Sequence, residues 1–232
     1  KVHSTWASPN TTYEDAVLAF VDGALDPEAS KTFLAAFLPF EERVARLAIH
    51  NSLVQTTLKL TVPGVPDIYQ GADLWDLSLV DPDNRRPVDY ECRVRLLEQS
   101  AATPMRELLA RWQDGAVKLQ LTSKILAFRA ADAELFARGE YEPLPATGPK
   151  ADLICAFARR NGERSAIIMT ARFPARLEAD PDWSGTAVAL PQHLAGKTWR
   201  NVLTGAVLQA GEASPEAGLA LDGLPIAVFA AD

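Results

Sequence analysis

Apolar side chains recur every three or four residues near the start of the chain, which predicts an amphipathic helix that ends at Pro27. Its apolar stripe consists of Tyr13, Ala16, Val17, Phe20, Val21 and Ala24. The same spacing predicts a second helix over residues 28–38 and a third from about residue 40 towards residue 60. The first part of the chain is therefore expected to be helical.

The hydrophobic spacing changes after residue 60. Pro63, Gly64 and Pro66 break any helix, and residues 67–69 are long enough only for a short strand. A long helix, a short apolar strand and then a polar loop follow one another in this order in (β/α) barrels. Because the loops after the strands build the active site of such barrels, the loop over residues 71–86 lies where function is expected.

Helical patterns return after this loop. Pro87 can open a helix at its first position, and residues 91–100 continue it. Further helical patterns cover residues 104–112 and 116–130. The segment over residues 137–152 is rich in Gly and Pro, which favours a crossover to a new domain.

From Leu153 onward the pattern predicts strands. Two apolar runs are joined through Asn161-Gly162, a strong hairpin signal. Further short strands are expected at Thr186–Leu190, Thr198–Asn201, Ala206–Leu208 and Ile226–Phe229. The predicted fold class is α+β, with a mainly helical domain over residues 1–140 and a small antiparallel β-sandwich over residues 150–232.

Composition narrows the function classes. The chain has 232 residues and a net charge of -7, which argues against a nucleic-acid partner, and no apolar run approaches the ~20 residues that cross a bilayer. Cys92 and Cys155 lack the spacing of a zinc site, so we expect no zinc there. Two isolated cysteines favour reduced thiols and a cytoplasmic setting. A calcium loop starting at Asp81 fails, because Arg85 and Arg86 occupy its fifth and sixth positions.

Several stretches carry a family resemblance. Residues 63–71, PGVPDIYQG, are similar to the segment around the eighth barrel strand in the α-amylase superfamily, glycoside hydrolase family 13. Residues 74–90, LWDLSLVDPDNRRPVDY, more specifically resemble the maltooligosyl trehalose synthase family within it. Residues 3–16, 118–144 and 224–229 also resemble that family. The resemblance implies that residues 1–140 are the C-terminal part of a (β/α)8 barrel.

The resemblance also implies an activity for the whole enzyme. That family converts the reducing-end α-1,4 linkage of a maltooligosaccharide to an α,α-1,1 linkage by intramolecular transfer, a step in trehalose biosynthesis. Retaining glycosidase chemistry of this kind needs two carboxylates, and the resemblance therefore implies that no metal or organic cofactor is required. In the superfamily, these and a third aspartate lie on strands that would precede Lys1, so this chain is expected to contain no catalytic residue. The implied partners are the maltooligosaccharide and the missing N-terminal part of the enzyme.

The candidate substrate-binding residues all lie in the loop and just before it. They are Tyr69, Gln70, Asp73, Trp75, Asp83, Asn84 and Arg85. The resemblance places an arginine at the donor-sugar pocket in the position of Arg85, whose planar fork can hold a carboxylate and sugar hydroxyls. Alternatively, Arg85 folds the loop through an ion pair with Asp81, Asp83 or Asp89.

The other candidates also have two interpretations. Asp83 and Asn84 either bind sugar hydroxyls or form a turn. Trp75 either stacks on a glucose ring or packs beneath the loop. Asp73 stands where an acidic residue is common in the superfamily, and structural support of the loop is its alternative role. Tyr69 and Gln70 stand at the end of the expected strand, where side chains reach a barrel's site.

Two other functions remain open. The whole protein could be another α-glucan hydrolase of the superfamily, although residues 76–90 favour the synthase. The β region could be a non-catalytic module that binds glucan or braces the barrel. Glucan binding needs exposed aromatic side chains in a row, and this region contains only Trp183 and Trp199 as tryptophans. Bracing is therefore favoured.

Overall fold

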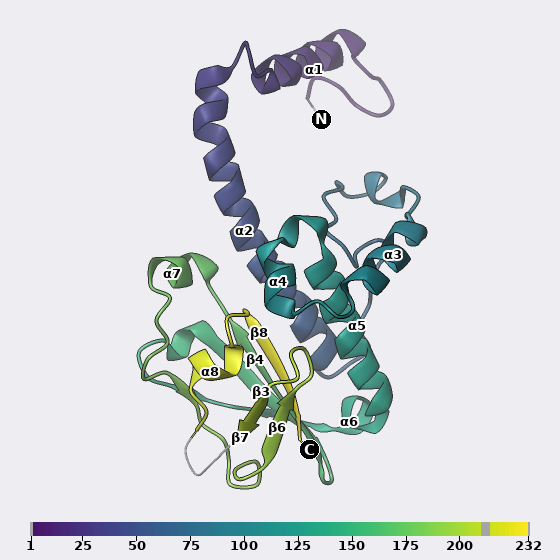
Figure 1. The fold of residues 1–232 in the computed structure, drawn as a ribbon. Helices are drawn as coiled ribbons and strands as arrows, with labels where there is room; N and C mark the ends of the chain where they lie inside the picture. The colour runs from purple at the N-terminus through teal and green to yellow at the C-terminus, as the bar shows by residue number, and fades with distance from the viewer. Residues whose placement is uncertain (1, 210–213, 232) are drawn as a thin grey trace. The chain divides into compact units, whose positions relative to one another are not determined.

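The computed structural model describes residues 2–209 and 214–231, and the contacts group the chain into two units, residues 1–48 and 49–232 (Figure 1). The first unit holds helix α1, Thr11–Leu25, and the first part of helix α2, Lys31–Thr61. Asn10 caps α1, because its side-chain oxygen accepts a hydrogen bond from the Tyr13 N–H at 3.1 Å. The predicted first helix is confirmed.

Helix α2 is one continuous element, so the predicted break before residue 40 is wrong. Pro39 lies inside the helix. Proline has no N–H to donate to the Ala35 carbonyl, which normally ends or kinks a helix. Both residues are exposed, so water can reach that carbonyl, and the apolar spacing on either side continues the helix.

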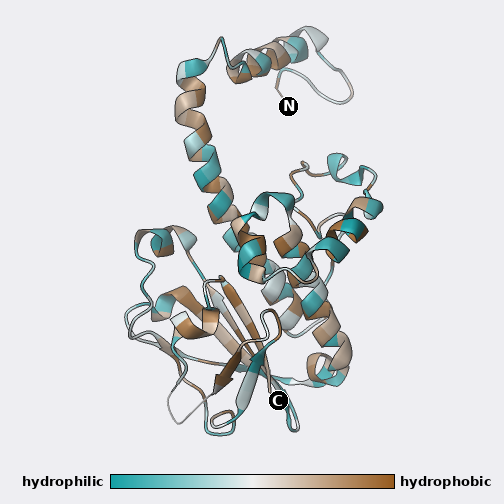
Figure 2. Ribbon diagram, viewed as in Figure 1, coloured by the Kyte–Doolittle hydropathy of each residue, from teal (hydrophilic) through white to brown (hydrophobic). Residues whose placement is uncertain are grey.

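The first unit leaves much of its apolar surface exposed. No residue of α1, all of which the structure describes, is buried. Phe20 is 75% exposed, Phe40 is 61% exposed and Trp6 is 79% exposed. Figure 2 shows apolar residues in brown along α1 and the start of α2. Apolar patches of this kind mark surfaces that contact another polypeptide.

The second unit continues with short helices. They are α3, Tyr90–Ser100; α4, Met105–Ala110; α5, Ala116–Ala131; α6, Ala133–Arg138; α7, Pro174–Ala179; and α8, Ala217–Leu221. Helix α3 begins after Pro87, contrary to the prediction that this proline opens it. Asp89 is the cap instead, since its carboxylate accepts from the Cys92 N–H at 2.8 Å. The predicted helix over residues 116–130 is confirmed as α5.

Antiparallel strands follow the helices, as predicted. Within the described residues they form a six-stranded sheet in the order β1-β3-β4-β8-β6-β7 and a two-stranded sheet of β2 and β5. Their bounds are β1, Glu140–Pro143; β2, Ala146–Thr147; β3, Ile154–Asn161; β4, Arg164–Ala171; β5, Ala187–Val188; β6, Thr198–Asn201; β7, Val207–Gln209; and β8, Ile226–Ala231. Glu140–Pro143 pairs with β3, so the predicted crossover already contains a strand of the sheet.

The six-stranded sheet is covered on both faces, and alternate residues of β4 show this. Ala166 and Ile168 belong to a core shared with α4, α5, α6 and the end of α2, which we call the helix-side core. Ile167 and Met169 belong to a second core that includes residues of β5 and α8. This two-residue alternation is the pattern of a strand buried on both faces. The sheet thereby joins the helices to the C-terminal elements.

The hairpin predicted between the two apolar runs is confirmed. Strands β3 and β4 pair antiparallel, with Asn161 opposite Arg164. The turn is therefore Gly162-Glu163, one residue beyond the predicted Asn-Gly pair. Gly162 has a φ of +58°, which glycine adopts without the steric cost of a Cβ.

No strand forms at residues 67–69, and this prediction is wrong for the chain as described. Residues 65–69 have no regular secondary structure, although all of them are described. A strand exists only when its N–H and C=O groups pair with a neighbouring strand. The sheets of this chain do not extend to residues 67–69, so the segment has no ladder to join.

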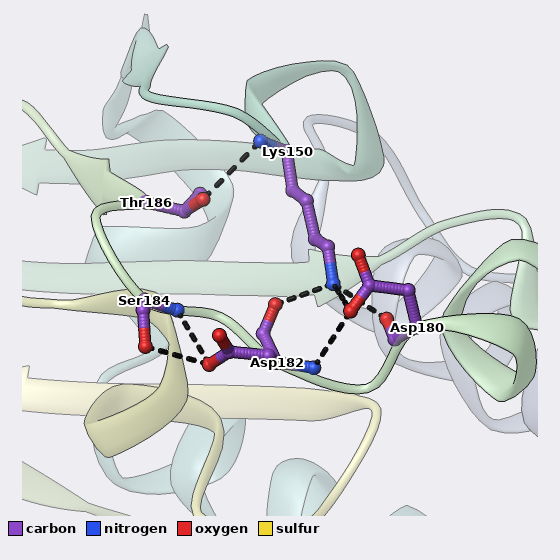
Figure 3. A network of polar contacts seen from close by, with 5 residues as sticks. All are labelled: Lys150, Asp180, Asp182, Ser184 and Thr186. Carbon is purple, nitrogen blue, oxygen red and sulfur yellow. Dashed lines mark hydrogen bonds and ion pairs between the residues drawn. The ribbon is translucent and has the colours of Figure 1, made fainter.

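Lys150 orders the loop that precedes β5 (Figure 3). Its ammonium group lies 2.9 Å from the Asp180 carboxylate and donates to the backbone carbonyls of Asp180 and Asp182. The Lys150 backbone N–H donates to the Thr186 hydroxyl at 3.2 Å. The hydrogen bond from Lys150 lowers the pKa of the Asp180 carboxyl. Because these partners belong to one loop, the buried lysine fixes that loop against the sheet.

His50 makes the stability of the second unit depend on pH. Its Nε2 lies 2.9 Å from the Ala171 carbonyl oxygen, so this nitrogen carries the hydrogen. Burial lowers the pKa of His50, and the hydrogen bond to Ala171 opposes that shift. The unfolded chain therefore binds a proton at higher pH than the folded chain. The unfolding free energy is expected to fall as the pH drops below 6.5, the ordinary histidine pKa.

A His50→Gln variant tests this expectation, because glutamine can donate to the carbonyl but does not titrate. Urea unfolding at about pH 7.5 and about pH 5.5 should show a smaller loss of unfolding free energy in the variant than in the wild type. Asp180 and Asp182, whose pKa values are lowered from 3.8, titrate below this range. Equal losses in both proteins would show that His50 is not the source.

Candidate functional site

Arg93 on α3 holds the first part of the loop. Its guanidinium lies 2.7 Å from the Asp73 carboxylate and donates to the Gly71 carbonyl at 3.0 Å. A side chain at Gly71, where φ is +85°, would meet Val88 at 3.2 Å, so glycine suits this close approach. Asp73 thus supports the loop in this structure, as in the structural alternative. Its contact with a substrate stays a prediction.

Trp75 lies at the base of the loop. Its indole N–H donates to the Trp112 carbonyl at 2.6 Å, and its ring packs against the helix-side core. The Lys118 ammonium lies 5.6 Å from the ring centre and donates to the Leu74 carbonyl at 2.9 Å. Burial, with Lys59 nearby, lowers the pKa of Lys118. This geometry matches the packing alternative for Trp75, and stacking on a sugar stays a prediction.

The tip of the loop gathers the three candidates Asp83, Asn84 and Arg85 in one 3₁₀ turn. Arg85 forms an ion pair with Asp81, one of the three loop-folding partners that the sequence left open, and its side chain is 69% exposed. Arg86 lies 3.8 Å from the Asp83 carboxylate. The buried amide oxygen of Asn84 has no hydrogen-bond partner among the described residues.

Tyr69 and Gln70 lie in the segment that leads into the loop. Both side chains are exposed, and Tyr69 is 47% exposed. The Ala72 N–H donates to the Tyr69 carbonyl at 3.1 Å, which starts the turn at Gly71. These two candidates therefore belong to a different part of the loop from the turn that contains Arg85.

Sequence reasoning missed Arg93 and Lys118, which hold the loop to α3 and α5. Arg93 stands four residues after Asp89, a spacing at which helical residues are neighbours. That signal says nothing about Asp73, which is Arg93's ion-pair partner. The contact between Lys118 and the Leu74 carbonyl spans 44 residues, and no local pattern predicts it.

The described part of the chain shows neither a metal-binding cluster nor a membrane-spanning helix. Over residues 2–209 and 214–231, no group of three or more His, Cys, Asp or Glu side chains is placed to hold a metal ion. None of the helices in these ranges combines the length and the apolar character that a membrane span requires.

Known proteins resemble this chain in sequence. Two curated proteins assigned as maltooligosyl trehalose synthases, from two strains of Mycobacterium tuberculosis, are each 38% identical to it over 205 residues. This alignment covers 88% of the chain but 23% of each relative, so the chain spans about a quarter of their length. No protein-family model matches the chain.

Solved structures resemble it in fold. Maltooligosyltrehalose synthase from Arthrobacter ramosus matches with a TM-score of 0.80 and 28% identity, covering 99% of this chain and 28% of that chain. An α-amylase from Geobacillus thermoleovorans matches with a TM-score of 0.51 and 16% identity, covering 79% of this chain and 33% of that chain. The α-amylase shares the fold alone. This chain is a homologue of part of the maltooligosyl trehalose synthases, as the motif at residues 74–90 predicted.

Proposed function

We propose that this chain forms the C-terminal portion of an enzyme that makes maltooligosyl trehalose. The enzyme converts the reducing-end α-1,4 linkage of a maltooligosaccharide to an α,α-1,1 linkage by intramolecular transglycosylation. The observation that carries this proposal is the alignment with the Mycobacterium relatives over 88% of this chain. The match to the Arthrobacter synthase over 99% of the chain supports it.

The catalytic carboxylates belong, in this proposal, to the remainder of the enzyme. One carboxylate attacks the anomeric carbon and forms a glycosyl-enzyme, and the other acts first as acid and then as base. The loop over residues 66–90 forms one wall of the sugar pocket. Arg85 binds there through charge-assisted hydrogen bonds, and Asp83, Asn84, Tyr69 and Gln70 contact sugar hydroxyls.

The fold of the complete enzyme follows from the same proposal. Residues 1–140 complete a (β/α)8 barrel, and residues 150–232 form a β-sandwich that braces it. The exposed apolar side chains of the first unit, such as Phe20 and Phe40, support a covering polypeptide. Residues 67–69 lack a strand partner here and become the barrel's last strand when the remainder of the sheet is present. We place the enzyme in the cytoplasm.

The bracing role is favoured over a glucan-binding module by the state of the two tryptophans. Trp199 is 0% exposed, so it cannot stack on a polysaccharide. Trp183 is partly buried against the second core, the one that includes residues of β5 and α8. Its Cβ lies 3.2 Å from the position of a Cβ built on Gly218. The Lys150 ammonium also lies 5.9 Å from the centre of the Trp183 ring, over one of its faces.

Maltopentaose distinguishes these proposals. The full-length protein should consume reducing ends and form a non-reducing product, whereas the 232-residue chain alone should form none. Products are separated by anion-exchange chromatography, and reducing ends are counted by a colorimetric assay. Turnover by the chain alone would disprove the placement of the carboxylates elsewhere. Release of glucose without the non-reducing product would identify an α-glucan hydrolase instead.

A further inference from the structure

The end of helix α2 is held by two arginines from other elements. Arg159, on β3, donates to the Thr61 carbonyl at 2.9 Å, and Arg129, on α5, donates to the Leu60 carbonyl at 2.6 Å. Arg159 also donates to the carbonyls of Phe136 at 3.1 Å and Gly139 at 2.9 Å. One side chain of the sheet therefore joins the last turn of α2 to the end of α6.

Neither guanidinium group forms an ion pair with a carboxylate among residues 2–209 and 214–231. Arg159 is only 1% exposed. Carbonyls at helix C-termini carry partial negative charge, which favours a cation there. The Phe136 ring adds a further contact, 4.8 Å from Arg129 and 5.9 Å from Arg159. Burial lowers the pKa of Arg159, although an arginine stays charged at neutral pH.

A contribution to stability does not by itself explain why an arginine is buried at this position. Removing a charge from water costs several kcal/mol, and apolar side chains of similar volume often stabilise a core as well or better. What a planar guanidinium adds is geometry, because its fixed donors set the positions of several carbonyls at once. Here the carbonyls that it sets include the last one of α2, at Thr61.

The chain after Thr61 leads directly to the candidate site. Residues 62–71 run between two fixed points: the arginines at the end of α2, and Arg93, which holds the Gly71 carbonyl. Tyr69 lies inside this span with its side chain exposed. A shift of the α2 end therefore moves this side chain, while Arg93 holds the other end of the segment.

We propose that Arg159 is a positioning residue for the transfer reaction, acting through the end of α2 on the segment that carries Tyr69 and Gln70. The inference rests on the proposed function. In transfer, the anomeric hydroxyl of the released glucose attacks the glycosyl-enzyme, its proton passes to the acid/base carboxylate, and the bond to the nucleophile breaks. Water that attacks in the same way yields a shortened oligosaccharide and leaves glucose free. A displaced wall of the pocket admits water and loosens the glucose.

The test is the product ratio of Arg159→Met in the full-length protein with maltopentaose. Glucose released per maltooligosyl trehalose formed should rise about tenfold, since small misplacements near a reacting centre have effects of this size or larger. Arg159→Lys, which keeps the charge but loses the fork, should give an intermediate rise. The ratio is a property of each turnover, so loss of folded protein does not change it.

Lys124→Met is the matched control. Lys124 on α5 donates to the Leu203 carbonyl at 3.0 Å, so it too is a cation that binds a backbone carbonyl between the helices and the sheet region. Among the residues that the structure describes, Lys124 forms no hydrogen bond or ion pair with the loop or with α2. In this variant the Leu203 carbonyl loses its donor, as the Thr61 carbonyl does in Arg159→Met, but the product ratio should stay at the wild-type value.

An unchanged ratio in Arg159→Met would overturn the inference and leave Arg159 a structural residue. If that variant does not fold, the ratio of Arg159→Lys decides: a rise supports the inference, and a wild-type ratio overturns it. If the wild-type protein forms no maltooligosyl trehalose, the proposed function itself is wrong. That result is distinct from an unchanged product ratio in Arg159→Met.

Discussion

Replacing Arg85 with alanine in the full-length protein is expected to lower kcat/KM for maltopentaose about a hundredfold. Two decades correspond to about 2.7 kcal/mol of transition-state stabilisation, the size of a lost charge-assisted contact in a closed site. The folded protein should be almost unaffected. The Arg85 side chain is 69% exposed and its partner Asp81 is 58% exposed, and exposed ion pairs contribute about 0–1 kcal/mol.

Asp81→Asn separates the two roles that the sequence left open for Arg85. This variant removes the ion pair and keeps the guanidinium. If Arg85 only folds the loop, both variants should lose activity equally. If Arg85 binds substrate, Asp81→Asn should keep most of the activity. Arg86→Ala serves as the neighbouring control, because Arg86 is also exposed and lies 3.8 Å from its acidic partner. Wild-type kinetics in Arg85→Ala, with an unchanged thermal midpoint, would rule out the substrate role.

Elements with strong local patterns were predictable from the sequence. Helix α5 lies within one residue of the predicted range, because one face of the helix is buried at nearly every turn. Strand β6 has its predicted bounds, Thr198–Asn201. The β3–β4 hairpin followed from two apolar runs around a glycine that adopts a positive φ. In each of these elements, local preference and tertiary packing agree.

Elements that depend on distant partners were not predictable. Pro39 normally breaks a helix, yet α2 continues through it, and the exposed Ala35 carbonyl that lacks its donor can bond to water. Glu140–Pro143 became a strand because β3 supplies its partner, and residues 67–69 stayed irregular because none is supplied. Propensity cannot distinguish these two cases, since strand formation depends on the neighbour.

In the candidate loop, too, local features were predictable and long-range contacts were not. Its position after a long helix, its turn at residues 83–85 and its charged tip follow from local sequence. The contacts that hold it do not. Arg93 binds the Gly71 carbonyl across 22 residues, and Lys118 binds the Leu74 carbonyl across 44 residues. A single sequence carries no record of which distant cation meets which carbonyl.

Replacing Trp199 with alanine is expected to lower the unfolding free energy by about 3–5 kcal/mol, which is the range for truncating a buried aromatic side chain. Trp199 is fully buried on β6, within the core that includes Val188 of β5 and Leu221 of α8. Its loss leaves a large cavity on the face of the sheet opposite the helix-side core. Urea denaturation followed by circular dichroism measures this change.

Trp199→Phe is the matched variant, because it keeps most of the apolar volume and removes the indole N–H. That N–H is buried without a hydrogen-bond partner among the described residues, so its removal leaves no acceptor unpaired. Phenylalanine is smaller than tryptophan and leaves a small cavity, so we expect a cost well below that of Trp199→Ala. A similar cost for both variants would mean that volume is not what Trp199 contributes.

The same pair of variants tests the bracing role of the sheet region. If this region braces the enzyme, loss of activity in Trp199→Ala should follow the loss of folded protein as urea is added, and Trp199→Phe should remain active to higher urea. If the region binds glucan through Trp199, both variants should bind starch weakly even in the absence of urea. Trp199 has 0% exposure and cannot touch a polysaccharide. We therefore expect both variants, when folded, to bind starch as strongly as the wild type does.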